Sequence, residues 1–229
     1  MQKVSEVNKI KKNLIVTMTC RPLNDDTKFE GINKLEKFFG TLKNSDHLVL
    51  KFKHVTAEKS AENLKEFDKQ ITDFTKKHKN TLYKAVIIYY HGIYYQEKDC
   101  TTFDVENGFL KESCAINSLK EDIPMISIID GNICNKIPFE IFRSCHKILN
   151  DNECIIYTSQ FGNKIDNTDC FAEELANVLE KKEFKTIEEM LFDKIGKKCE
   201  GKHGYSLNMD MYPKDVDVNT EFMNIIHDK

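Results

Sequence analysis

The chain has 229 residues, of which 34 are Lys or Arg and 37 are Asp or Glu, and its formal net charge is -3. This length can bury one large core, and the interleaving of bases with acids argues against nucleic acid as a partner. No apolar run reaches the roughly 18–20 residues that a membrane span needs, and residues 1–13 are polar rather than signal-like. The sequence therefore predicts a cytoplasmic protein that does not associate with membranes.

Eight cysteines are spread along the chain, and no two of them have the CxxC spacing that is typical of a structural zinc site. In a reducing compartment such residues usually pack as small apolar side chains. We expect ordinary thiols here, with neither a metal nor a cofactor. The cysteines are Cys20, Cys100, Cys114, Cys134, Cys145, Cys154, Cys170 and Cys199.

Apolar periodicity in the first half of the chain predicts strands that alternate with helices. The predicted strands are short apolar and β-branched runs at residues 14–20, 47–55 and 84–90. The predicted helices carry an apolar residue every three or four positions, at residues 32–42 and 64–74.

The second half continues this alternation. A small hairpin is predicted at 101–110 and a short helix at 111–117, followed by strands at 125–130 and 154–158, helices at 171–179 and 187–195, and an edge strand at 216–223. Such alternation predicts a mostly parallel sheet that is covered on both faces. Ligands of these sheets bind at the carboxyl ends of strands, so we expect function in the loops after Tyr90, Asp130 and Thr158.

Two of these strand ends resemble the caspase family. The run KAVIIYY leads into His91-Gly92, which resembles the strand and His-Gly element of the caspase catalytic histidine. Residues 103–132 resemble the passage that leads to the caspase nucleophile, and CIIYTSQFG resembles the first strand of the small subunit. Tyr89 and Tyr90 are expected to pack in the sheet.

The resemblance covers residues 14–223 and implies a three-layer α/β/α sandwich, in which helices flank a central, mostly parallel sheet. It divides one domain into a large-subunit-like region at 14–132 and a small-subunit-like region at 153–229. Residues 133–152 would then be an intersubunit-type linker, and residues 1–13 a short polar N-terminal segment.

The caspase signature at the nucleophile is Gln-Ala-Cys-Arg-Gly or a close variant. The aligned residues here run from Asp130 to Cys134, which puts Asn132 at the nucleophile position while His91 is retained. An amide cannot replace a thiolate as a nucleophile, so we expect no enzyme activity.

The caspase pocket for a substrate aspartate is also degenerate. The resemblance places Asp130 at the pocket glutamine, where its charge would repel an acidic substrate, with Gly131 beside it. Asp25 and Asp26 lie in the loop where the first pocket arginine is expected.

The resemblance therefore implies a pseudocaspase, which would regulate apoptosis or caspase signalling by binding an active caspase or an apoptosis regulator. A homodimer or heterodimer through the C-terminal edge strand is an expected mode of association. One alternative is an active cysteine endopeptidase of altered specificity that uses Cys134 with His91. A weaker alternative is a peptide-binding module unrelated to cell death.

Overall fold

The structure is a computed structural model. It describes residues 10–21, 29–53, 69–70, 72–94, 96–97, 100–101, 123–133, 152–161, 170–199, 205–213 and 217–227.

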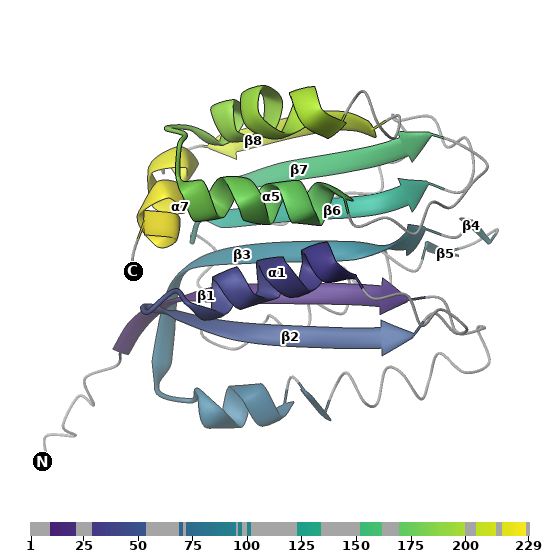
Figure 1. The fold of residues 1–229 in the computed structure, drawn as a ribbon. Coiled ribbons are helices and arrows are strands. Elements are labelled where there is room, and N and C mark those ends of the chain that lie inside the picture. Colours follow the sequence, from purple (N-terminus) through teal and green to yellow (C-terminus); the bar gives the residue numbers. More distant parts are fainter. Residues whose placement is uncertain are drawn as a thin grey trace, which may run out of the picture.

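A six-stranded sheet forms the centre of the fold (Figure 1). Its strands, in spatial order, are β2 (Ser45–Lys53), β1 (Ile10–Arg21), β3 (Thr81–Tyr94), β6 (Met125–Ile133), β7 (Asn152–Phe161) and β8 (Tyr205–Pro213). The first five are parallel, and β8 runs antiparallel to β7 at the edge. The predicted strands at 14–20, 47–55, 84–90, 125–130 and 154–158 are confirmed in this sheet. A separate two-stranded sheet joins β4 (Gln96–Glu97) to β5 (Cys100–Thr101).

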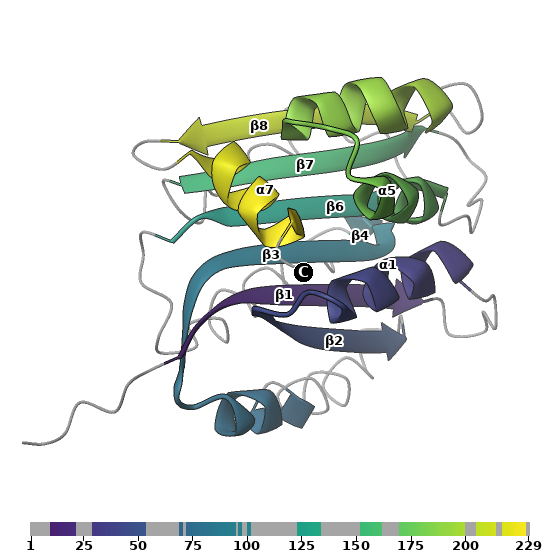
Figure 2. The same ribbon diagram turned by 60° about the vertical axis from the view of Figure 1, so that its left-hand side comes forward.

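A layer of helices covers one face of the sheet (Figures 1 and 2). It contains α1 (Glu30–Gly40), α5 (Cys170–Lys181), the π-helix η2 (Glu189–Gly196) and α7 (Val218–His227). The apolar stripes predicted at 32–42, 171–179 and 187–195 are confirmed, because their residues form the core under this layer. The α5 helix ends where Lys182 adopts a left-handed backbone conformation, with φ of 56°.

The central strands are buried on both faces, as a covered parallel sheet requires. Ile15 and Ile87 join the core beneath the helices, while Leu14 and Val86 point to the opposite face. All four side chains are fully buried. The architecture is therefore a layered α/β sandwich.

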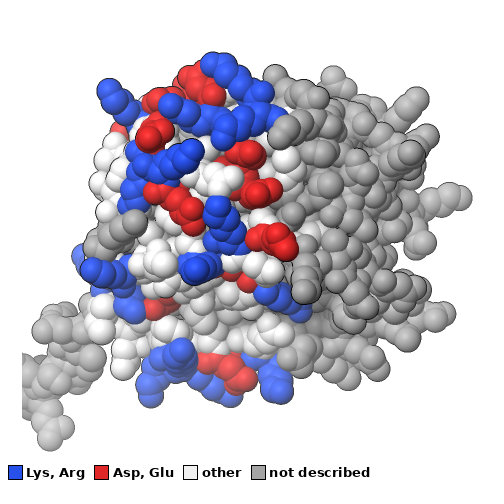
Figure 3. All heavy atoms as spheres, viewed as in Figure 1, with Lys and Arg blue, Asp and Glu red and all other residues white. Residues whose placement is uncertain are grey.

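The outer side of the helical layer carries both signs of charge. Figure 3 shows Lys and Arg side chains interleaved with Asp and Glu over this face. Lys198 lies 2.7 Å from Glu174, and Lys34 lies 3.7 Å from Glu180. No basic patch forms on the described part of this face. Among the described residues, no helix combines the length and apolar character that crossing a membrane requires.

The predicted edge strand at 216–223 is wrong, because residues 218–223 belong to helix α7. Val218, Phe222, Ile225 and Ile226 recur at helical spacing and are all buried. Asp217 caps the helix by accepting a hydrogen bond from the Thr220 amide at 3.2 Å. The edge strand of the sheet is β8, which ends at Pro213, just before this segment.

Other predictions fall largely outside the described residues. Within the predicted helix at 64–74, residues 69–70 and 72–74 are described and helical, and that helix continues to residue 77. The helix at 111–117 and most of the hairpin at 101–110 lie outside the described part, as does the linker from 134 to 151. Thr101 ends strand β5.

The loops expected after Tyr90, Asp130 and Thr158 begin later than predicted. Strands β3, β6 and β7 continue for three or four more residues, to Tyr94, Ile133 and Phe161. Each strand remains paired with its neighbours along this extension, so the ladder hydrogen bonds favour extended backbone. The candidate site therefore lies on strands.

Candidate functional site

The candidate site lies where three neighbouring parallel strands approach their carboxyl ends. Thr19 on β1 pairs in register with His91 on β3, and His91 pairs with Asp130 on β6. Residues in register on parallel strands share a face of the sheet, because the pleat alternates side chains along each strand. The register therefore places these three side chains in a row on the face that carries the helices.

Asp130 is the centre of this row. Its carboxylate is 2% exposed, and its Oδ2 atom lies 2.9 Å from Nδ1 of His91. The same oxygen accepts a hydrogen bond of 2.9 Å from the hydroxyl of Tyr89. Two donors thus compensate the burial of one carboxylate.

The contact with Asp130 orients the imidazole of His91. An ionised carboxylate only accepts hydrogen bonds, so Nδ1 carries the proton and Nε2 of the neutral ring is left as the acceptor. The ring of Phe29, just before α1, packs edge-on against it with centroids 5.2 Å apart. The His91 side chain is 12% exposed and so still reaches the surface.

This arrangement contains a proton acceptor and a group that orients it, which are two of the parts of a nucleophilic site. The carboxylate of Asp130 is buried inside the protein, where it accepts hydrogen bonds from His91 and Tyr89. The sequence did not reveal this contact, because the partners are 39 residues apart in the chain. Only the register between the two strands shows that His91 and Asp130 are neighbours, and that register cannot be read from either segment of the sequence alone.

The remaining predicted site residues are only partly described. Gly131 and Asn132 lie on β6, where they pair in register with Gly92 and Ile93. Asn132 is thus two backbone positions beyond the His91–Asp130 pair. Asp25, Asp26 and Cys134 lie outside the described residues.

The threonine of the row is buried without a polar partner. Thr19 is 1% exposed, and its hydroxyl forms no hydrogen bond in the described part of the chain. A buried hydroxyl without a partner costs stability. Tyr89 and Tyr90 are buried in the sheet, which confirms that part of the prediction.

Cys199, which the sequence did not single out, lies close enough to this carboxylate for Asp130 to affect the pKa of its thiol. Burial raises the pKa of the Cys199 thiol to about 12, with further contributions from Cys170, Glu174 and Asp130. Cys199 continues the buried stripe of Leu191 and Ile195 at four-residue steps, a spacing visible in the sequence. Cys154, Cys170 and Cys199 are free thiols, and the prediction that cysteines pack as small apolar side chains is confirmed for the buried Cys154 and Cys199.

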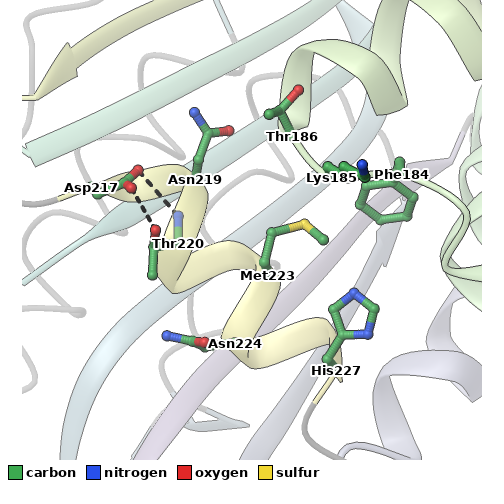
Figure 4. Close-up of a pocket in the computed structure, with 9 residues that line it drawn as sticks. All are labelled: Phe184, Lys185, Thr186, Asp217, Asn219, Thr220, Met223, Asn224 and His227. Carbon is green, nitrogen blue, oxygen red and sulfur yellow. Dashed lines mark hydrogen bonds between the residues drawn. The ribbon is translucent and has the colours of Figure 1, made fainter.

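A pocket of about 540 Å³ lies apart from this site, between α7 and the segment that leads from α5 to η2 (Figure 4). Figure 1 places α7 at the end of the sheet where the parallel strands begin. Several lining groups already have partners: Asn219 accepts a hydrogen bond from the Ile187 amide, and Asp217 accepts bonds from Thr220. Within the described residues, no group of three or more His, Cys, Asp or Glu side chains could hold a metal ion.

The described architecture is a caspase-like fold. The crystal structure of drICE is similar, with a TM-score of 0.50, 12% sequence identity and coverage of 89% of each chain. The crystal structure of Caspase-1 from Spodoptera frugiperda has a TM-score of 0.48 and 13% identity, and the match covers 90% of this chain and 89% of that one. At these identities the likeness establishes the fold alone. The sequence matches no family profile and no curated protein.

Proposed function

We propose that this protein is a pseudocaspase: a caspase-fold protein without peptidase activity that regulates apoptosis or caspase signalling. It would act by binding an active caspase or an apoptosis regulator. The observation that carries the proposal is the register between β3 and β6. Opposite His91 the strand supplies Asp130, and the next two positions supply a glycine and an asparagine.

None of these three residues can act as a peptidase nucleophile. A caspase-type reaction needs a thiolate at the end of this strand, within reach of the imidazole. The carboxylate of Asp130 is buried and already accepts two hydrogen bonds, so it is not available to attack a substrate. The side-chain amide of Asn132 is not nucleophilic. Loss of a nucleophile that acts together with its base typically costs several orders of magnitude in rate.

Inactivity can be tested with a peptide probe that carries a thiol-reactive group. The purified protein should remain unlabelled under reducing conditions, and Asn132→Cys should gain labelling at position 132 because the oriented His91 is already present. The Cys134→Ala protein is the matched control and should behave as wild type does. Labelling of wild type at Cys134 would overturn the proposal.

One specific observation favours a second candidate, an active cysteine endopeptidase that uses Cys134 with His91. The hydrogen bond from His91 to Asp130 orients the base, as the third member of a catalytic triad does. This candidate predicts that a probe labels Cys134 and that either His91→Ala or Cys134→Ala abolishes labelling. It also predicts hydrolysis of some peptide that does not carry an aspartate.

Strand β8 is the proposed surface for association with a partner. It lies at the edge of the sheet and pairs with β7 on one side, with no described strand on its other side. The open edge of a strand presents backbone donors and acceptors to which another strand can add. Association there could produce a homodimer or a heterodimer with a caspase.

Two consecutive proline substitutions in β8 provide matched tests of this edge. In an antiparallel strand, consecutive amides alternate between the paired side and the open side. Of Asn208→Pro and Met209→Pro, one should keep the fold and lose binding, while the other should lose stability. Binding is measured by co-purification with an active caspase and by the change in that caspase's cleavage rate. Unchanged binding by the variant that keeps the fold would exclude this edge.

A further inference from the structure

The π-helix η2 carries an exposed phenylalanine near its centre. Phe192 is 43% exposed, and among the described residues only Ile10, at the start of β1, is a more exposed large apolar side chain. Figures 1 and 2 show η2 as the unlabelled green helix that lies over β8 at the edge of the sheet, and the two elements are in contact. Much of the Phe192 ring is thus left in water, and burial against a partner would be favourable.

The geometry of η2 places a charged residue on each side of this phenylalanine. A π-helix joins residues five apart by hydrogen bonds, so side chains four or five positions apart lie along one face. Phe192 therefore lies between Glu188, which precedes the first turn, and Lys197, which follows the last. Asp193 lies beside Phe192 and forms an ion pair with Lys197 at 3.1 Å. All four side chains are exposed, and together they are called the η2 stripe.

The η2 stripe is complementary to itself when its direction is reversed. Glu188 lies four residues before Phe192, and Lys197 lies four residues after Asp193. Two copies of η2 that pack antiparallel around a two-fold axis would therefore bring Glu188 of each copy to Lys197 of the other, with the two Phe192 rings between them. The helix dipole by itself favours an acid before a helix and a base after it. It does not account for the exposed phenylalanine at the centre.

We propose that the η2 stripe binds a second copy of this chain, in a symmetric dimer whose two-fold axis passes beside Phe192. This inference rests on the association proposed above at β8, because four residues fall short of the roughly 20–30 per side that a stable interface holds. Pairing between the β8 strands of the two copies would supply the remaining contacts, since η2 lies over β8. The ion pair of Lys197 with Asp193 is highly exposed and contributes little, so Lys197 is available to the second copy.

Sedimentation of the full chain over a range of concentrations tests the apolar contact. Wild type should form a dimer as the concentration rises. Phe192→Asp should weaken self-association by at least about tenfold, because a central aromatic side chain usually dominates an interface. Ile10→Asp is the matched control: it places the same charge on the other exposed apolar side chain and should associate as wild type does. Both variants should keep the wild-type melting temperature, because both positions are exposed.

An exchange of charges tests the antiparallel arrangement. Glu188→Lys would place lysines opposite each other at both ends of the stripe, and Lys197→Glu would place acids there, so each variant alone should associate more weakly than wild type. In an equimolar mixture every acid again meets a lysine, so the two variants should bind each other more tightly than either binds itself. The protein with both changes should recover wild-type self-association. Added salt should reduce all of these differences, because the charges are exposed.

Three results would overturn this proposal: a wild-type chain that stays monomeric, unchanged self-association of Phe192→Asp, or a mixture of the charge variants that binds no more tightly than its components. Co-purification with an active caspase is measured on the same proteins and reports on the proposed function instead. Phe192→Asp should still bind the caspase through β8, and loss of that binding would show that the stripe does not select a second copy. Wild type that forms the dimer but binds no caspase would contradict the proposed function and leave the η2 stripe in place.

Discussion

The buried carboxylate of Asp130 provides a direct test of how the candidate site is held together. The substitution Asp130→Asn keeps the shape of the side chain but removes its charge and replaces one acceptor by a donor. In the wild type one oxygen accepts bonds of 2.9 Å from both His91 and Tyr89. The oxygen of the asparagine can still accept both bonds, but it carries no charge, so each bond is weaker.

The expected cost follows from the number and type of these bonds. A hydrogen bond to a charged group is worth about 1.5–3 kcal/mol, against about 0.5–1.5 kcal/mol for a neutral one. Weakening two such bonds at a site that is 2% exposed should therefore lower the free energy of unfolding by about 2–3 kcal/mol. For a chain of this length, the melting temperature should fall by about 5–10 °C.

Urea unfolding of four proteins separates this effect from general damage to the core. The set is wild type, Asp130→Asn, Tyr89→Phe and the double variant. Because both single changes disrupt the same hydrogen bond, the double variant should be less destabilised than the sum of the two single variants. A loss below about 0.5 kcal/mol for Asp130→Asn, or strict additivity, would show that the carboxylate does not hold these partners.

Three further predictions concern the scaffold. Burial lowers the pKa of His47 from 6.5 to about 4, so the folded state keeps this ring neutral. The free energy of unfolding should therefore be highest above pH 6.5 and should fall as the pH drops toward 4. Urea unfolding at each pH should show a loss on the order of 3 kcal/mol relative to His47→Gln. An equal slope in both proteins would contradict the assignment. Leu175→Ala should cost about 2–5 kcal/mol in the same assay, because this fully buried leucine lies where α5 packs on the core, and a loss near zero would mean that α5 is not docked. Asp217→Ala should speed hydrogen exchange of the α7 amides above pH 4, because the pKa of this carboxyl is lowered by hydrogen bonds from Thr220, and unchanged exchange would show that this cap does not hold the helix.

Local patterns in the sequence were sufficient to predict most of the sheet and the helices that cover one of its faces. Runs such as KAVIIYY are apolar without interruption, which is typical of strands buried on both faces. The error at 216–223 arose where alternating charged residues suggested a strand, although Val218, Phe222 and Ile225 carried the helical period. Strand ends were also placed early, because their extension depends on hydrogen bonds to neighbouring strands.

By itself, the sequence determined the order of strands and helices, the caspase-like fold class and the position of His91 near the carboxyl end of a strand. The tertiary structure decided which groups surround that histidine. The contacts of Asp130 with Tyr89 and His91 join two neighbouring strands whose register brings these residues together. Periodicity depends on neighbours along the chain, whereas these contacts depend on how separate elements pack, and for that reason only the folded chain could reveal them.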